Sequence, residues 1–281
     1  MSKRMLPQAG ISARPGLSSR VTDDAFKRWN PDVRAASADA DATITILDQI
    51  GEDYYGEGVS SKRIAAALRA IGDRDVTVVI NSPGGNYFEG LSIYNMLREH
   101  KGSVTVKIVG IAASAASVIA MAGDTIKIAR AGFLMIHNAW VIASGNRHSL
   151  RDVADWLVPF DATAVDIYHA RTGIDGTALA AMLDREAWIG GKDAIDQGFA
   201  DNFLDADEID ASQDAKASSA SALRAERRLD QLLKVSGISR SEQREIVAAL
   251  KGGKPGAAPT GTQDAAISEA LSAFLTSLET K

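Results

Sequence analysis

The sequence predicts an α/β fold with a parallel sheet, because strand-like and helix-like segments alternate from residue 41 to residue 205. Apolar runs of strand length occur at 43–47, 76–80, 104–109, 125–129 and 133–136. Segments with apolar residues at helical spacing lie between them, at 60–71, 88–100 and after residue 114. Strands that alternate with helices of ten or more residues favour parallel pairing. Such repeats stack readily into a layered spiral, although periodicity leaves the strand order open.

Local signals predict where several helices begin and end. Ser60 is a candidate N-cap for the helix at 60–71, and Gly72 follows its last apolar position. A long amphipathic helix is expected at 149–172, and Pro159 should kink or break it. Shorter helices are expected at 175–184 and 192–197.

The segments that flank residues 41–205 differ in composition. Residues 1–40 are polar and predict a flexible arm, with a short helix around 24–29. Residues 206–222, which are rich in Ala, Ser and Asp, predict a linker. Residues 223–281 predict a helical extension with a hairpin at 223–250, in which Gly237 ends the first helix and Ser239 with Glu242 forms a capping box. A last amphipathic helix at 267–278 would need a partner to bury its apolar face.

Composition excludes several classes of function. The chain has 281 residues and a formal net charge of −5, without the basic patch that nucleic-acid binding requires. It contains no cysteine, which excludes disulfides and thiol catalysis. The N-terminus lacks the apolar core of a secretory signal, and the longest apolar run, 108–123, is too short to span a membrane.

A serine at the start of a buried helix is the candidate nucleophile. Ser114 follows an apolar run and precedes an Ala-rich segment. Helix N-termini present free amides and the positive end of the helix dipole, which can stabilise an oxyanion. Serine is also a common N-cap residue, so Ser114 alone fits both interpretations.

A serine nucleophile needs a base, and His137 is the best placed of the four histidines. It directly follows the apolar run 133–136, at the end of a predicted strand, where sites gather in open α/β sheets. His100, His148 and His169 lie in helical or polar contexts and are expected at the surface. A lone histidine at a strand end is also compatible with a structural role.

The sequence Asn-Ser-Pro-Gly-Gly at 81–85 predicts a tight turn after the strand at 76–80. Its backbone can approach a ligand closely because glycine has no Cβ. The amides of Gly85 and Ala115 could together bind an oxyanion, although an ordinary strand-to-helix turn explains the motif equally well.

In combination, these motifs resemble the Clp-type serine proteases. The likeness covers about Thr43 to Leu204 and includes the downstream segment 184–201. It is closest to the ClpP-related head maturation (prohead) proteases of tailed phages. Their Ala-Ala-Ser-Ala-Ala-Ser signature and the aromatic residue after the acid are matched by residues 112–117 and Trp188, and the hairpin around 237–242 is similar to the tail of those proteins.

The resemblance implies a ClpP/crotonase-like spiral of ββα units, with residues 149–172 as the long helix that mediates assembly into rings. It also implies that Ser114 is the nucleophile, that His137 is the general base and then the acid, and that the amides of Gly85 and Ala115 form the oxyanion hole.

The third member of the triad departs from the family's pattern. The family's catalytic aspartate aligns with Glu186, whose longer side chain needs a different backbone placement. Asp184 is the reserve candidate, and Glu186 is preferred because the segment after it then aligns without a gap. Ser82 is expected to be structural, and Ser117 is expected to pack in the core.

The leading hypothesis is therefore a serine endopeptidase that works without an ATP-driven unfoldase. It would process capsid or scaffold precursors during phage head maturation, in the host cytoplasm and the procapsid. The expected partners are copies of the same chain in a ring and the precursor proteins, with no nucleic acid, membrane, metal or cofactor.

Three alternatives follow from the same residues. The chain could be a catalytically weak or inactive assembly scaffold with the same fold. A crotonase-type hydratase or isomerase ranks lower, because its chemistry makes no use of a serine–histidine pair. A Ser–Lys peptidase also ranks lower, because no lysine has a context as favourable as that of His137.

Overall fold

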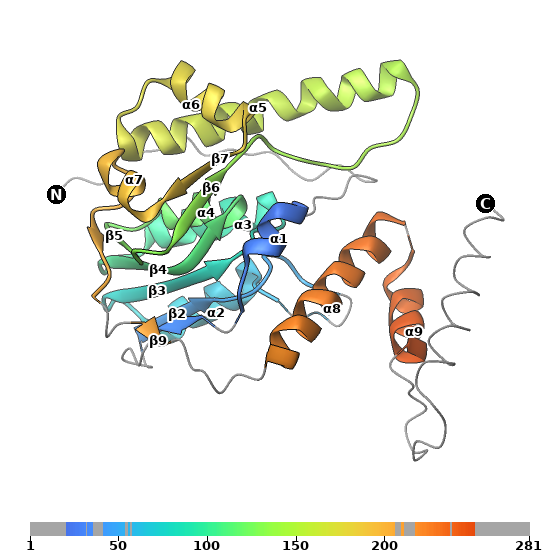
Figure 1. Ribbon diagram of the computed structural model, residues 1–281, viewed down its shortest axis with the longest axis horizontal. Coiled ribbons are helices and arrows are strands. Elements are labelled where there is room, and N and C mark those ends of the chain that lie inside the picture. Colours follow the sequence, from blue (N-terminus) through green and yellow to red (C-terminus); the bar gives the residue numbers. More distant parts are fainter. Residues whose placement is uncertain are drawn as a thin grey trace, which may run out of the picture.

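The computed structural model describes residues 21–31, 33–35, 42–53, 56, 58–205, 209–210, 217–236 and 238–250. In these residues a mostly parallel sheet runs through the centre of the molecule, with helices packed around it (Figure 1). This arrangement confirms the predicted α/β class.

The main sheet has seven strands in the described part of the chain, five of which were predicted. They are β2 (Thr43–Ile46), β3 (Val76–Ser82), β4 (Val104–Ala113), β5 (Thr125–Ile128), β6 (Phe133–Ile136), β7 (Ala187–Gly190) and β8 (Asn202–Phe203). The order is β2-β3-β4-β5-β8, with β6 paired to β4 and β7 paired to β6. Only β7 is antiparallel to its neighbour. The sequence gives no clear period for β7 and β8, because the strands are four and two residues long.

Strand β4 is long enough to pair with two successive neighbours. Its residues 105–108 pair with β5, and residues 111–113 pair with β6. The ends of β4 and β6 therefore lie side by side. The residues that follow them, Ser114 and His137, leave the sheet at the same edge, where sites in parallel sheets form.

The helices follow the predicted pattern closely. They are α1 (Asp23–Arg28), α2 (Ser61–Ile71), α3 (Tyr87–Glu99), α4 (Ala115–Ala120), α5 (Arg147–Thr172), α6 (Gly176–Asp184), α7 (Gly191–Asp196), α8 (Ala217–Val235) and α9 (Arg240–Leu250). Gly72 ends α2 with a φ of 72°, as expected. Ser60 occupies the N-cap position, but its hydroxyl makes no capping bond. The carboxylate of Glu89 instead accepts from the amide of Ser61, at 2.6 Å.

Helix α5 continues through Pro159, so of the two expected effects the break does not occur, and the kink stays a prediction. A proline removes one amide donor and crowds the preceding turn. Pro159 is exposed, so the carbonyl that loses its partner can be solvated, and the carbonyl of Pro159 itself accepts from the hydroxyl of Thr163 at 2.8 Å.

The flanking segments contain more regular structure than the sequence indicated. Helix α8 begins at Ala217, inside the segment predicted as a linker. Strands β1 (Arg34–Ala35) and β9 (Ile209–Asp210) form a small antiparallel sheet. The capping box of α9 is confirmed, because the backbone amide of Ser239 donates to Glu242 and the amide of Glu242 donates back to the Ser239 hydroxyl. Gly237, residues 1–20 and the predicted helix at 267–278 lie outside the described residues.

Helix α1 corresponds to the short helix predicted near residue 24, and it covers one face of β4 and β6. Phe26 and Trp29 pack in a buried cluster with Ile111, Ala113 and Met135. The indole of Trp29 donates to the carbonyl oxygen of residue 81 at 2.9 Å. The N-terminal helix therefore supports the strand ends that carry the candidate site.

Candidate active site

Ser114 lies at a sharp turn between β4 and α4. Its φ of 54° and ψ of −123° are rare for a residue with a Cβ. Among the described residues other than glycine, only Ser114 and Glu186 have a positive φ. Such strain costs of order 1–3 kcal/mol and persists where the surrounding structure holds it in place. The amide of Ser114 donates to Met135 of β6 at 2.8 Å, which fixes the turn against the strand that leads to His137.

The imidazole of His137 contacts the hydroxyl of Ser114 directly. His137 Nε2 lies 2.7 Å from Ser114 Oγ, within hydrogen-bond distance. Burial lowers the pKa of His137 to about 4. The ring is therefore neutral at pH 7 and able to accept a proton. The structure thus brings together the nucleophile and the base that the sequence predicted.

The turn at 82–86 lies against the backbone of the candidate nucleophile. A Cβ on Gly84 would come within 2.8 Å of Ser114 Cβ and 2.5 Å of the carbonyl oxygen of Ala113. Gly85 has a φ of 145°, and Ala115 is the first residue of α4. Among the turn and loop hydrogen bonds of the described residues, none uses the amide of Gly85 or of Ala115 as donor. Both amides can therefore serve an oxyanion.

The candidate third members of the triad occupy different places. β6 and β7 pair with Ile136 opposite Ala187, so the next positions outward are His137 and Glu186. In the described part of the chain, no hydrogen bond joins Nδ1 of His137 to a carboxylate. Glu186 lines a separate hollow with Trp188 and Asp193. Asp184, the reserve candidate, is exposed and accepts from the side-chain amide of Asn138 at 2.8 Å.

Glu186 has the better position of the two carboxylates. Glu186 precedes Ala187, the partner of Ile136, so the β6–β7 pairing brings its backbone near that of His137. The strained backbone of Glu186, with φ of 51°, is also typical of residues held for a function.

Sequence reasoning missed several groups around the serine and histidine. A small cavity of about 20 Å³ is lined by Gly85, Tyr87, Ser114, Val118, His137, Asn138, Ala139, Trp140, Ala164 and Tyr168. Asp161 of α5 accepts from the amide of Ala139 at 2.6 Å and so fixes the segment after the histidine. Burial raises the pKa of Asp161. Long-range contacts of this kind leave no pattern in the sequence.

Two of the other serines anchor the backbone. Ser117 does more than pack, because its hydroxyl lies 2.6 Å from the carbonyl oxygen of Ser114 and 2.8 Å from the hydroxyl of Tyr168. Ser82 donates to the carbonyl of Asp48 at 2.6 Å and accepts from the amide of Gly84 at 3.2 Å. The predicted structural role of Ser82 agrees with these bonds.

The remaining histidines are not part of this site. His148 and His169 are exposed, as expected. His100 is buried, and its Nε2 lies 2.7 Å from the carbonyl oxygen of Arg74, so the expectation of a surface position was wrong. It follows the end of α3, where the backbone turns back against the α2–β3 loop.

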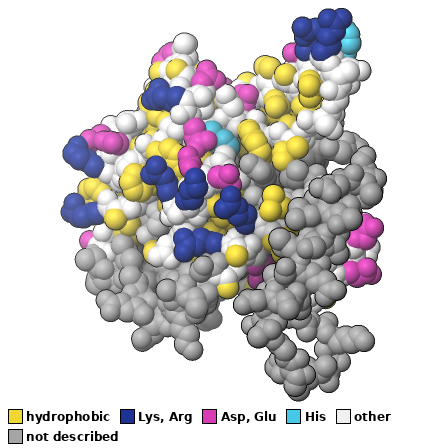
Figure 2. Space-filling view, turned by 45° about the vertical axis from the view of Figure 1, so that its right-hand side comes forward, with side chains coloured by type: hydrophobic (Ala, Val, Ile, Leu, Met, Phe, Trp, Pro, Cys, Tyr) yellow, Lys and Arg dark blue, Asp and Glu magenta, His cyan; other side chains and the backbone are white. Residues whose placement is uncertain are grey.

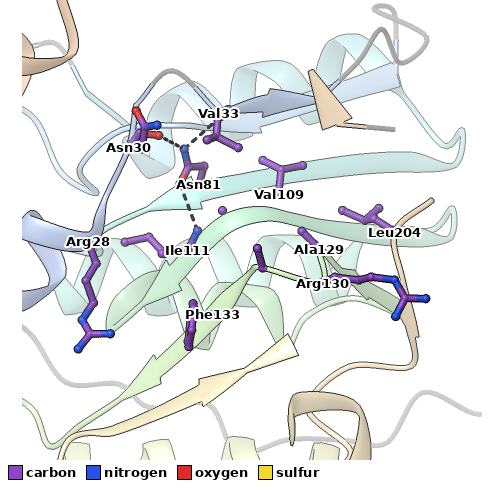
Figure 3. Close-up of a pocket in the computed structure, with 12 residues that line it drawn as sticks. Arg28, Asn30, Val33, Asn81, Val109, Ile111, Ala129, Arg130, Phe133 and Leu204 are labelled. Atoms are coloured by element: carbon purple, nitrogen blue, oxygen red, sulfur yellow. Dashed lines mark hydrogen bonds between the residues drawn. The ribbon is translucent and has the colours of Figure 1, made fainter. Parts of the chain in front are cut away.

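A second and larger hollow lies away from the serine and histidine (Figure 3). Its volume is about 760 Å³, and its wall is mostly apolar. The side chains of Arg28 and Arg130 stand at opposite ends of it, and Asn81 fixes its upper wall through bonds to residues 30, 33 and 111. None of the residues predicted for catalysis lines this hollow.

The described residues show neither a metal centre nor a membrane span. No group of three or more His, Asp or Glu side chains among them is placed to hold a metal ion. No helix in the same part of the chain is both long and apolar enough to cross a bilayer.

The mostly parallel α/β core carries a strained serine with a neutral histidine at hydrogen-bond distance. This arrangement defines a protein of the serine-hydrolase class. The family model for the Clp proteases matches residues 36–207, which is more than half of the chain. The chain belongs to the Clp protease family.

Named relatives agree with this assignment. The chain is 32% identical over 135 residues to the ATP-dependent Clp protease proteolytic subunit of Deinococcus radiodurans, which covers 47% of this chain and 66% of the relative. It is 30% identical over 161 residues to the ATP-dependent Clp protease proteolytic subunit 1 of Prochlorococcus marinus, covering 54% and 83%. The likeness therefore covers about half of this chain.

Proposed function

We propose that this protein is a serine endopeptidase in which Ser114 is the nucleophile and His137 is the general base. The observation that carries the proposal is the distance of 2.7 Å between His137 Nε2 and Ser114 Oγ, at a strained strand-to-helix turn. Membership of the Clp protease family supports the same reaction class.

The proposed reaction follows from the positions of these groups. His137 takes the proton of the Ser114 hydroxyl as Oγ attacks the peptide carbonyl. The amides of Gly85 and Ala115 then stabilise the negative oxygen of the tetrahedral intermediate. His137 then gives the proton to the departing amine, and the acyl group stays bound to Ser114. In the second half of the reaction, His137 takes a proton from a water molecule that attacks the acyl-enzyme. The proton returns to Ser114 Oγ as the acid product leaves.

Glu186 is the proposed third member of the triad. Its place directly before Ala187, which pairs with Ile136, supports a role in which its carboxylate accepts from Nδ1 and stabilises the imidazolium that forms during the reaction. Asp184 is less suitable, because it already accepts from Asn138.

The proposed substrates are capsid or scaffold precursors of a tailed phage, cleaved without an ATP-driven unfoldase. The support is the likeness of residues 112–117 and Trp188 to the head maturation proteases. In the structure, the ring of Trp188 lies 4.3 Å from the guanidinium carbon of Arg28, next to the helix that supports the site. A ring of identical chains is the proposed assembly.

The test compares the parent chain with Ser114→Ala, each expressed with the capsid precursor. The parent should process the precursor and react with a fluorophosphonate probe at residue 114. The variant should do neither, because it lacks the attacking oxygen. Ser103→Ala is the matched control, since that serine is exposed in the loop before β4, and it should retain labelling. Unchanged processing by Ser114→Ala would refute the proposal.

A second candidate function is an assembly scaffold with little or no turnover. The observation that favours it is that no carboxylate among the described residues contacts Nδ1 of His137. A scaffold of this kind would support capsid assembly equally well with Ser114→Ala, and the parent would not react with the fluorophosphonate probe.

A further inference from the structure

Helix α8 holds a buried arginine against the loop that follows β2. The side chain of Arg227 is 6% exposed. Its Nε lies 3.0 and 3.1 Å from the two carboxylate oxygens of Asp48, and its Nη2 lies 2.6 Å from one of them. Nη1 donates to the buried carboxylate of Asp53. One guanidinium from the C-terminal extension therefore binds two carboxylates of the protease core (Figure 1 shows α8 beside α1).

The same loop is hydrogen-bonded to the candidate oxyanion turn. The carbonyl of Asp48 accepts from Ser82, and the hydroxyl of Ser82 accepts from the amide of Gly84. The amide of Ile50 donates to the carbonyl of Gly84 at 2.8 Å, and the amide of Asn86 donates to the carbonyl of Ile50 at 2.9 Å. Residues 48–50 and 82–86 are thus joined by three hydrogen bonds, and a fourth, from the Gly84 amide to the Ser82 hydroxyl, braces the turn itself.

The fit around Gly85 leaves little freedom for independent movement. A Cβ on this residue would lie 2.1 Å from the carbonyl oxygen of Ile50. Any displacement of the loop at 48–50 would therefore shift the Gly85 amide. On its other side, the Gly84 backbone rests against Ala113 and Ser114, so the turn is held between the loop and the nucleophile.

Loss of the Arg227 guanidinium would leave the carboxylates of Asp48 and Asp53 without this positive charge and so destabilise the loop after β2. Asp53 has a side chain that is only 4% exposed. A buried carboxylate without its cation is strongly unfavourable. Loss of the guanidinium also removes its hydrogen bonds to Asp48 and Asp53, so α8 no longer holds the loop, and the bonds from Asp48 and Ile50 to the turn can move with it.

We propose that Arg227 is a positioning residue for the oxyanion hole: through Asp48 and Ser82 it fixes the turn that presents the Gly85 amide to the reacting carbonyl. The inference rests on the proposed serine peptidase function. It gives the C-terminal extension a part in the reaction, although Arg227 itself touches no reacting atom.

The test uses the full-length chain with Arg227→Gln and Arg227→Lys. The matched control is Arg228→Gln, which removes a neighbouring charge on the same helix from an exposed ion pair with Asp23. The measurements are kcat and KM for a p-nitrophenyl ester and the rate of fluorophosphonate labelling. Thermal melts establish that each variant is folded at the assay temperature.

Loss of an oxyanion donor typically lowers kcat by about 10²–10³-fold, so a misplaced one should lower it by about 10–100-fold in Arg227→Gln. KM should stay within about twofold of the parent value. The pH midpoint of the rate should stay within about 0.3 pH units of the parent value, because His137 is unchanged. Arg227→Lys should recover part of the rate, since a lysine supplies the charge but not the forked geometry. Arg228→Gln should match the parent.

Hydrogen exchange of the peptide that covers residues 82–90 gives a second readout. Exchange should be faster in Arg227→Gln than in the parent or in Arg228→Gln. A folded Arg227→Gln with parental kcat and parental exchange would overturn the inference. A parent chain that neither hydrolyses the ester nor reacts with the probe would overturn the proposed function itself, and the positioning role would fall with it.

Discussion

Ser114 and His137 form a pair whose properties depend on burial rather than on a nearby charge. Burial is the cause of the lowered His137 pKa, and no charged group contributes to the shift. The base is consequently neutral at physiological pH. A carboxylate at Nδ1 would raise its pKa, so the titration of His137 reports directly on the third member of the triad.

The depressed pKa of His137 makes stability depend on pH. In the unfolded chain the imidazole titrates near 6.5, and in the folded chain near 4. Between these values the unfolded state binds more protons, so the free energy of unfolding should fall as the pH is lowered from 6.5 towards 4, by about 3 kcal/mol.

Urea unfolding at pH 7.5 and pH 4.5 measures this effect, with His137→Gln as the variant that lacks the titrating group. The difference between the two pH values should be smaller in the variant by about 2–3 kcal/mol. The same pH dependence in both chains would show that His137 is solvated or paired with a carboxylate.

Replacing Glu186 or Asp184 with its neutral amide counterpart distinguishes which carboxylate is the third member of the triad. Glu186→Gln should lower kcat about 10²-fold or more, because a neutral side chain cannot stabilise the imidazolium. Asp184→Asn should stay within about twofold of the parent, since its contact is with the side chain of Asn138. Ester hydrolysis with purified chains gives both values, and the reverse order of effects would assign the role to Asp184.

At the scale of elements, short connections and strand ends position the site. The register of β4 on β6 places Ser114 beside Met135, and the register of β6 on β7 pairs Ile136 with Ala187, the neighbours of His137 and Glu186. Helix α1 covers one face of β4 and β6. Trp29, which follows the last residue of α1, is fully buried, and its indole donates to the carbonyl oxygen of residue 81.

Trp29→Ala should lower the free energy of unfolding by about 3–5 kcal/mol, because it opens a large cavity and removes the indole hydrogen bond. Lys27→Ala, on the exposed side of the same helix, should change it by about 0.5 kcal/mol or less. Chemical denaturation measures both. A small effect of Trp29→Ala would mean that α1 contributes little to the packing of β4 and β6.

The elements that the sequence predicts well are those with a strong local signal. The strands β2 to β6 have continuous or alternating apolar runs, and the turn glycines at 84–85 and the capping box of α9 have specific residue types. The strand β7 lacks such a signal, because it forms by pairing with β6. The paired residues Ile136 and Ala187 are more than 50 positions apart in the sequence. His100 was misplaced for the same reason, since its partner is the distant carbonyl of Arg74.

The candidate site was predictable as far as its backbone is concerned. Motif order located Ser114, His137 and Gly85 because each follows a strand, and strand ends converge in a parallel sheet. The groups that support them could not be predicted. Arg227 lies 179 residues from Asp48, and no periodicity relates two ends of a chain that meet only after folding.

At the scale of the whole molecule, the N-terminal half of α5 projects beyond the core (Figure 1). Figure 2 shows this end standing out from the surface, with hydrophobic side chains along it and a tip that carries basic groups and a histidine. Leu150 and Val158 are exposed by 43% and 61%. An apolar face of this kind suits contact with further copies of the chain, as expected of the proposed ring.

Val158→Lys should therefore shift the protein to smaller assemblies, because a charge at the contact must be desolvated. Asp155→Asn, an exposed polar change on the same helix, is the control and should leave the assembly intact. Light scattering coupled to size-exclusion chromatography gives the mass of each. Identical masses for the parent and Val158→Lys would place the contact elsewhere on the surface.

The ion pair between α8 and the loop after β2 has a consequence for the order of events during synthesis. Synthesis starts at the N-terminus, so a ribosome makes Ser114, His137 and the described strands of the main sheet before it makes Arg227. If this arginine sets the oxyanion turn, a chain that ends before residue 227 would be a poor peptidase even though the strands of its main sheet are complete. Such a delay in activity would limit the cleavage of other newly made proteins by incomplete chains.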